Sequence, residues 1–117
     1  MLSASHHRAY QDFLTLLTKF EQVAENEAVI KEFQDLSAWY QAHIAVLDDR
    51  ELEPAIASRW LSVQTEIQRA FKLLSTDILF LASAKQNSTR QKRLKSINGR
   101  LGKLIGYCQI MLSKDNN

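Results

Sequence analysis

One long stretch constrains the fold of this chain more than any other feature. Residues 55–84 contain no proline and no glycine, and Pro54 stands directly before them. Apolar side chains recur within this stretch at intervals of three and four, which places them on one side of an α-helix. At about 1.5 Å per residue the helix is about 45 Å long, so shorter helices must pack along it. Its apolar side is formed by Ile56, Trp60, Val63, Ile67, Ala70 or Phe71, Leu74, Ile78 and Leu81.

The flanks of this helix are also informative. Pro54 suits a first helical turn, and the acids at 48, 49, 51 and 53 place negative charge near the positive end of the helix dipole. In the second half, Leu73, Leu79 and Phe80 add apolar side chains outside the main stripe. We therefore expect the second half of the helix to be the most enclosed part of the protein.

Asp77 lies within this apolar half, where an unpaired carboxylate is costly to bury. A last helix that returns antiparallel brings the region of Arg93 to Arg100 opposite Asp77. We therefore expect an ion pair from Asp77 to Arg93 or Arg100. The alternative is a hydrated Asp77 at the edge of the helix.

Three further helices are predicted, at about residues 6–25, 28–47 and 89–112, because each carries one apolar stripe. The segment 26–28 is a weak break, so a continuous rod is the alternative to a turn there, and Ser88 is a candidate N-cap for the last helix. The three stripes are Tyr10, Phe13, Leu14, Leu17, Phe20 and Ala24; Val29, Phe33, Leu36, Tyr40, His43 or Ile44, and Leu47; and Leu94, Ile97, Leu101, Leu104, Cys108 and Met111.

Together these elements predict an all-α fold, an up-down antiparallel four-helix bundle with one long central helix, formed by residues 1–117 as a single domain. Residues 1–5 are expected to be loose. Cys108 is expected to pack in the core, and a single cysteine allows no internal disulfide, which fits a reducing cytoplasm. The longest purely apolar run, residues 78–82, is too short to span a bilayer.

The histidines and Trp39 give weak functional signals. His6 and His7 are adjacent and have no acid beside them, so we expect them to be exposed to solvent and not to bind a metal. His43 is expected to be a core histidine rather than a catalytic base. Trp39 lies off its stripe, where it either packs at the end of the bundle or remains exposed as a docking residue.

The charge is unevenly distributed along the chain. Residues 1–77 carry seven Lys or Arg against twelve Asp or Glu, whereas residues 78–117 carry eight against one. On the last helix three glycines fall on the side opposite its apolar stripe, although each costs a helix about 1 kcal/mol relative to alanine. The glycines leave a groove that is flanked by cations, and a partner can approach the helix closely there. The alternative is a bent helix that binds nothing. The expected partner-binding residues are Lys92, Lys95, Gly99, Arg100, Gly102, Lys103 and Gly106.

Motifs that carry chemistry are missing from the sequence. It has no phosphate-binding glycine loop, no Gly-x-Ser-x-Gly elbow and no zinc-binding His-Glu-x-x-His. The four acids of residues 48–53 lack EF-hand spacing, so we expect them to cap the helix and be solvated. We therefore expect neither an enzyme nor a cofactor or metal site.

Two other classes of function remain open from the residues alone. Six cations on the last helix suit phosphate binding, but they spread around the helix and no helix-turn-helix is evident. A homo-oligomeric scaffold that associates through an exposed stripe is the second class. The six cations are Arg90, Lys92, Arg93, Lys95, Arg100 and Lys103.

Several segments carry a family resemblance, which covers mainly residues 53–112. They are Glu53-Pro54-Ala55, Ala57-Ser58-Arg59, Gln64-Thr65-Glu66-Ile67, Leu73-Leu74, Asp77, Phe80-Leu81 and Leu104-Ile105-Gly106-Tyr107-Cys108. The pattern resembles the cyanobacterial heterocyst-frequency control proteins of the PatD family. It departs from the family at Gly106, where a larger polar or basic residue is expected, so a contact inherited at this position is not carried over.

The resemblance implies a non-enzymatic developmental regulator that binds the tubulin-like division GTPase FtsZ and modulates its assembly. Cell division and heterocyst frequency are then the processes affected, and in a cyanobacterium without heterocysts only division applies. No catalytic residues are carried over. Because FtsZ-type GTPases are acidic proteins, the cationic side of the last helix is the surface we expect to meet them.

Overall fold

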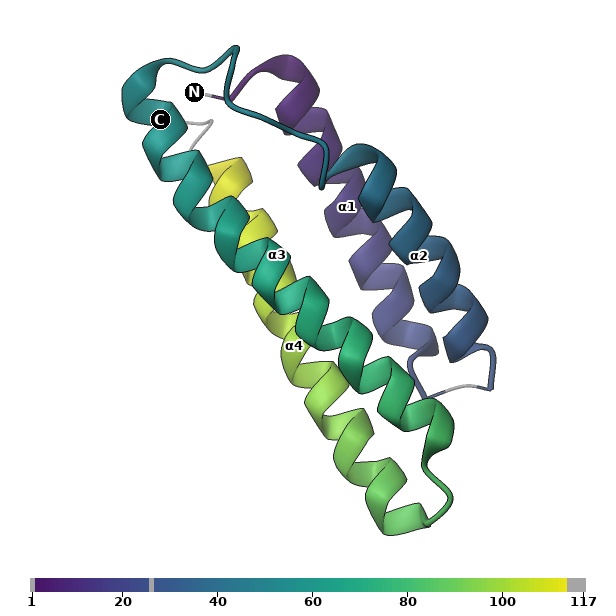
Figure 1. Cartoon of the computed structure of the whole chain (residues 1–117). Helices are drawn as coiled ribbons and strands as arrows, with labels where there is room; N and C mark the ends of the chain where they lie inside the picture. Colours follow the sequence, from purple (N-terminus) through teal and green to yellow (C-terminus); the bar gives the residue numbers. More distant parts are fainter. Residues whose placement is uncertain (1, 26, 114–117) are drawn as a thin grey trace.

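The computed structural model describes residues 2–25 and 27–113 as four helices. They are α1 (Ala4–Val23), α2 (Val29–His43), α3 (Pro54–Ser83) and α4 (Asn87–Ser113). The helices run alternately up and down, so that the α1–α2 hairpin packs against the α3–α4 hairpin (Figure 1). The predicted all-α four-helix bundle with one long helix is confirmed. Met1, Asn26 and residues 114–117, to which the predicted domain and the predicted turn also extend, lie outside the described residues.

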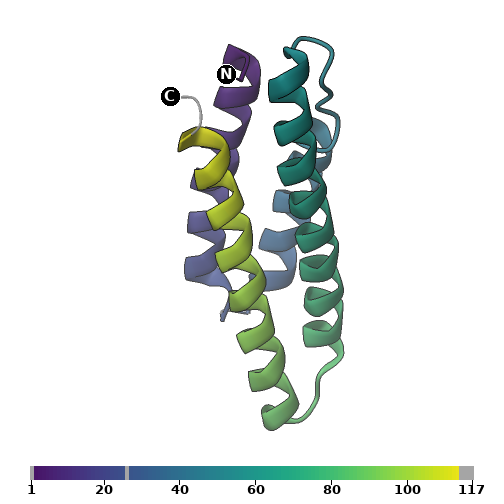
Figure 2. The same cartoon turned by 90° about the vertical axis from the view of Figure 1, so that its left-hand side faces the viewer.

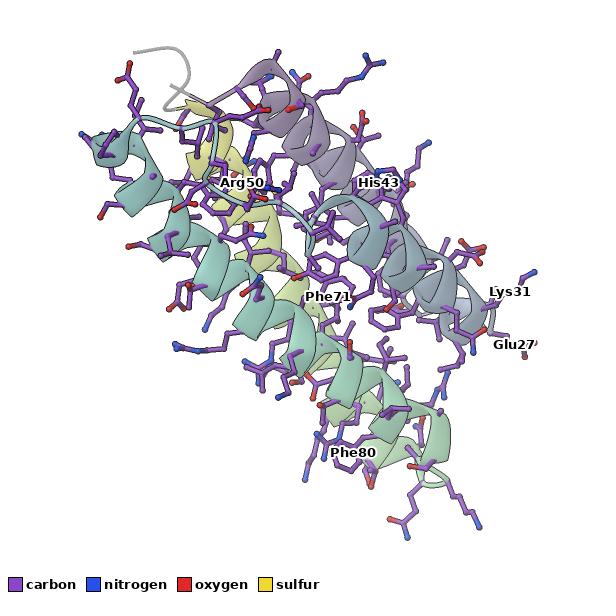
Figure 3. All side chains as sticks on the ribbon, turned by 45° about the horizontal axis from the view of Figure 1, so that its top comes forward. Glu27, Lys31, His43, Arg50, Phe71 and Phe80 are labelled. Atoms are coloured by element: carbon purple, nitrogen blue, oxygen red, sulfur yellow. The ribbon has the colours of Figure 1, made fainter. Side chains whose placement is uncertain are left out.

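The core lies along the predicted stripes. Both Ala70 and Phe71 are buried, and the Phe71 ring stacks on Tyr40 with 3.8 Å between ring centroids and on Phe33 with 5.5 Å. Figure 3 shows Phe71 between α2 and α3. Since α2 contacts α3 much less than α1 contacts α4, this aromatic cluster is a main link across the α2–α3 side.

A buried chain of hydrogen bonds joins three parts of the bundle. The indole Nε1–H of Trp60 donates to the Tyr10 hydroxyl at 2.8 Å, and that hydroxyl donates to Gln64 Oε1 at 2.7 Å. The Gln64 amide nitrogen in turn donates to the carbonyl of Ile44 at 3.0 Å. The chain links α1, α3 and the end of α2, and it satisfies side-chain groups that are expensive to bury unpaired.

The second helix ends at His43, so the expectation that it extends to residue 47 is wrong. The carbonyl of Ile44 accepts from the Gln64 amide at 3.0 Å and from the backbone N–H of Leu47, three residues on, at 3.1 Å. Ile44 is fully buried, whereas His43 is exposed and packs on Trp39 with 4.9 Å between ring centroids. The prediction of a core histidine at 43 is therefore wrong, and Ile44 takes that place in the core.

The expectation that residues 1–5 are loose and that His6 is exposed is also wrong for the described residues. The first helix begins at Ala4 with Ser3 as N-cap, and the Ser3 hydroxyl accepts from the His6 backbone N–H at 3.2 Å. His6 is 5% exposed, and its Nε2 bonds to the carbonyl of Asp48 at 2.8 Å. Its ring also meets Trp60 edge-on. The cause is its position four residues before Tyr10, on the buried stripe of α1.

The second half of α3 is less enclosed than predicted. The helix has 30 residues, whereas α2 has 15 and α1 has 20, so the α3–α4 hairpin continues past the α1–α2 turn (Figures 1 and 2). Leu73, Leu79 and Phe80 are 39%, 71% and 48% exposed. The prediction that this half is the most enclosed part is wrong: Leu74, Ile78 and Leu81 on the stripe are buried, but Leu73, Leu79 and Phe80 lie beside the stripe, on sides of α3 that face solvent.

The last helix begins at Asn87, so Ser88 lies inside it and is not its N-cap. Among the described residues, the helices are too short or too polar for any of them to cross a membrane.

Candidate functional site: the cationic face of the last helix

The orientation of α4 is fixed by its apolar stripe. All six predicted stripe residues are buried, and they face the core formed by the other helices. Because a helix turns by about 100° per residue, the side opposite this stripe is directed to solvent. The buried residues are Leu94, Ile97, Leu101, Leu104, Cys108 and Met111.

The three glycines lie on that outer side. Gly99 and Gly102 are exposed and Gly106 is half-buried. A Cβ atom added at any of them meets no heavy atom within 4 Å outside the local helix backbone. No contact within the folded chain therefore requires glycine at these positions. The helix is continuous from Asn87 to Ser113, so the glycines do not break it.

The lysines predicted for this surface are solvent-exposed. Lys92, Lys95 and Lys103 are all exposed and lie near the glycines on the helix surface. Residues 78–113 contain no acid, so no carboxylate of this segment neutralises them. We call Lys92, Lys95, Gly99, Gly102, Lys103 and Gly106 the α4 cationic face.

The arginines of α4 behave differently from the lysines. Asp77 is only 5% exposed, and Arg93 Nη1 lies 3.4 Å from its Oδ1. Arg100 Nε lies 3.4 Å from Asp77 Oδ2, close enough for an ion pair but without a hydrogen bond. The carboxylate of Asp77 thus lies between the two guanidinium groups named from the sequence, rather than hydrated at the helix edge.

Ser96 completes this cluster and was not expected from the sequence. Its hydroxyl donates to Asp77 Oδ2 at 2.8 Å, the shortest of the three contacts. Ser96 lies on α4 between Arg93 and Arg100, so the antiparallel pairing that predicts the arginines also places this hydroxyl near Asp77. A buried carboxylate with three partners is well compensated for its lost hydration.

The Asp77 cluster removes Arg100 from the α4 cationic face. Its side chain is only 30% exposed and is directed toward α3. Arg93 also pairs with Asp77, and its guanidinium carbon lies 4.4 Å from the centroid of the Phe80 ring, which holds the side chain further. The two arginines therefore join α3 to α4, and the exposed lysines and Arg90 are the cations of α4 that remain available to a partner.

The acidic loop is solvated, as expected, but it does not cap α3 through a side chain. Glu53 occupies the N-cap position without a side-chain hydrogen bond. Asp48 pairs with Arg50 at 2.8 Å, and the hydrogen bond from Arg50 lowers the pKa of the Asp48 carboxyl. Among residues 2–25 and 27–113, no group of three His, Cys, Asp or Glu side chains could hold a metal ion.

Trp39 and Cys108 pack against the core. Trp39 is half-buried, and its ring stacks on Phe13 with 5.9 Å between centroids. Cys108 is fully buried, and burial raises the pKa of its thiol to about 12. A thiol with so high a pKa is a poor nucleophile at neutral pH.

Relatives of known function would allow residue roles to be carried over to this geometry. Comparisons with protein-family models, curated proteins and solved structures find no match for this chain. Function must therefore be inferred from the surface itself, together with the resemblance described above.

Proposed function

We propose that this protein is a non-enzymatic regulator that binds an FtsZ-type division GTPase and modulates its assembly in the cytoplasm. Such a regulator affects cell division and, where heterocysts form, their frequency. The observation that carries the proposal is the α4 cationic face, a solvent-open surface whose three lysines have no acid in their own segment. The resemblance of residues 53–112 to the PatD family supplies the partner.

The chemistry of the face suits an acidic protein partner. Lysine side chains attract carboxylates at a distance and increase the rate of encounter. The open glycines let a backbone or a helix approach α4 more closely than side chains of ordinary size allow. Charge thus brings the partner to α4, and the glycines permit close packing once it arrives.

Nucleic-acid binding is the second candidate, and one observation argues against it. Of the six cations on α4, Arg93 and Arg100 are held by Asp77. Fewer free cations give a smaller phosphate-binding surface and a weaker dependence of affinity on salt. We therefore favour the protein partner.

Co-sedimentation with polymerising FtsZ, at low and at high salt, tests the proposal. The protein should pellet with filaments at low salt and pellet less at high salt, because salt screens charges on an exposed surface. Absence from the pellet under both conditions would refute FtsZ binding. A duplex DNA shift assay on the same preparation then tests the nucleic-acid candidate.

A further inference from the structure

The end of the α3–α4 hairpin, residues 79–93, carries two large apolar side chains that remain exposed, Leu79 and Phe80. We call this end the α3–α4 tip. Leu79 is 71% exposed and lines a hollow with Ile30 at the start of α2, and Phe80, which Figure 3 labels on the second half of α3, is 48% exposed. Neighbouring large apolar side chains that remain exposed on a small protein often mark a binding surface.

The α3–α4 tip is also strongly basic. It carries Lys85, Arg90 and Lys92, together with Arg93, which is paired with Asp77, and residues 79–93 contain no acid. Arg93 covers one side of the Phe80 ring at 4.4 Å from its centroid, so charge and apolar surface meet at the same place. A surface that binds this tip should therefore be both apolar and acidic.

The groove between α1 and α2 has that combination. Its apolar lining includes Phe20, Leu36 and Trp39, and Trp39 is supported from beneath by its stack on Phe13. Glu32 and Asp35 lie at the groove with Lys19 as the one cation among its lining residues. The adjoining α1–α2 turn adds Glu25 and Glu27, of which Figure 3 shows Glu27 at the end of the hairpin.

The two surfaces match each other in chemistry and differ in the sign of their charge. Each combines apolar side chains with charge, cations at the tip and two carboxylates against one lysine in the groove, which is an arrangement that favours association of unlike surfaces. Every copy of the chain carries both surfaces. A second copy is therefore the partner whose chemistry is already present in this protein.

Another hollow between α2 and α3 does not give such an argument. It is lined by Ile30, Phe33, Gln34, Ser37, Ser75, Ile78 and Leu79, and none of these is charged. Its chemistry does not select one partner over another. The groove between α1 and α2 is the surface whose charge identifies an occupant.

We propose that the α3–α4 tip of one copy docks in the α1–α2 groove of a second copy. The contact joins two different surfaces, so two assemblies are compatible with it. Two copies can form a dimer in which a two-fold axis makes the tip-to-groove contact twice, or each copy can bind the next and form a chain. Association would also let one assembly present several α4 cationic faces, which increases the strength of binding to a repeating filament.

A charge exchange between variants tests this contact without any other protein. The tip variant is Lys85→Glu with Arg90→Glu, and the groove variant is Glu32→Lys with Asp35→Lys; all four side chains lie outside the core cluster. Sedimentation velocity at low salt, over a series of protein concentrations, measures the mass of each variant alone and of their equimolar mixture. Circular dichroism verifies that both variants remain helical.

The wild-type mass should rise with concentration, and each variant alone should remain monomeric because like charges then face each other. The mixture should associate again, because the unchanged tip of one variant meets the unchanged groove of the other and the exchanged surfaces also attract. A wild-type protein that is monomeric at every concentration, or a mixture that remains monomeric, would overturn the proposal. FtsZ is absent from this assay. The assay therefore tests self-association whether or not the protein binds FtsZ.

Discussion

The hydroxyl of Tyr10 donates a hydrogen bond to Oε1 of Gln64 at 2.7 Å, and both side chains are buried. The same hydroxyl accepts the indole N–H of Trp60. Because the partners lie on α1 and α3, these bonds fix the register of two helices that are far apart in the sequence. A helix shifted by one turn would leave several buried polar groups without partners, at about 1–3 kcal/mol for each group.

Tyr10→Phe should therefore destabilise the protein although it keeps the ring. The change leaves Gln64 Oε1 and the Trp60 N–H buried without their partner, and we expect a loss of about 1–3 kcal/mol in the free energy of unfolding. Urea unfolding monitored by circular dichroism measures it. Tyr107→Phe removes the same hydroxyl from a half-buried ring and serves as the control, with a change within about 0.5 kcal/mol. Equal effects of the two changes would contradict the role given to Tyr10.

Asp77→Ala should lower the free energy of unfolding by about 2–3 kcal/mol, because it leaves two guanidinium groups of α4 without their carboxylate. The value lies below that of a fully buried pair since the arginine side chains are 37% and 30% exposed. Ser96→Ala removes only one donor and should cost about 1 kcal/mol. Wild-type stability of Asp77→Ala in the same urea titration would show that the cluster contributes nothing.

Gly99→Ala with Gly102→Ala should stabilise the fold, since the space around both positions is open. Each change should raise the free energy of unfolding by up to about 1 kcal/mol, because alanine loses less backbone entropy than glycine when a helix forms. The same variant should bind its partner more weakly if the partner approaches the α4 backbone closely. Thermal unfolding and co-sedimentation measure the two effects. A variant that is more stable and binds unchanged would exclude close approach at these glycines.

Alkaline pH should destabilise the protein partly through Cys108. Burial raises the pKa of its thiol from 9.0 to about 12, so above about pH 9 the unfolded chain loses a proton that the folded chain keeps. The free energy of unfolding should then fall as pH rises between about 9 and 12, by at most about 1.4 kcal/mol per pH unit for this group. Urea unfolding at pH 8, 9 and 10 should show a shallower fall in Cys108→Ala than in the wild type. Identical slopes would exclude the contribution of Cys108.

The bundle and its core could be predicted because helical periodicity is a local signal. The stripe of α4 and most of that of α3 are buried as expected. The Asp77 cluster could be anticipated as well, since an antiparallel hairpin places Arg93 and Arg100 opposite that carboxylate. Both results need only spacing within a helix and one turn.

The errors arose where one helix depends on the length or the side chains of another. Leu79 and Phe80 are exposed although Ile78 and Leu81 beside them are buried, because the neighbouring helices cover only the stripe side of α3. The ends of α1 and α2 depend on His6 and Gln64, polar residues that occupy buried stripe positions. His6 lies four residues before Tyr10, and Gln64 lies between Trp60 and Ile67, so helical spacing alone places both side chains on buried stripes. Because both residues are polar, they were not counted as stripe residues.

For the candidate site, too, spacing within one helix predicted some features, and others depend on a second helix. Spacing alone places the glycines and lysines on the outer side of α4, and that side is open to solvent. It does not separate Arg100 from the lysines, because the separation depends on a carboxylate of α3. The partner itself is not encoded in any of these distances, and it remains a proposal.

The most direct test of the central claim compares two charge-reversed variants in co-sedimentation with polymerising FtsZ at low salt. One replaces Lys92, Lys95 and Lys103 of the α4 cationic face with Glu. The other makes the same change at Lys31, Arg59 and Lys72, which are exposed on other helices, so both have the same net charge. We predict that the first variant no longer pellets while the second pellets nearly as well as the wild type, with both fully helical. Equal pelleting of the two variants would contradict binding through α4.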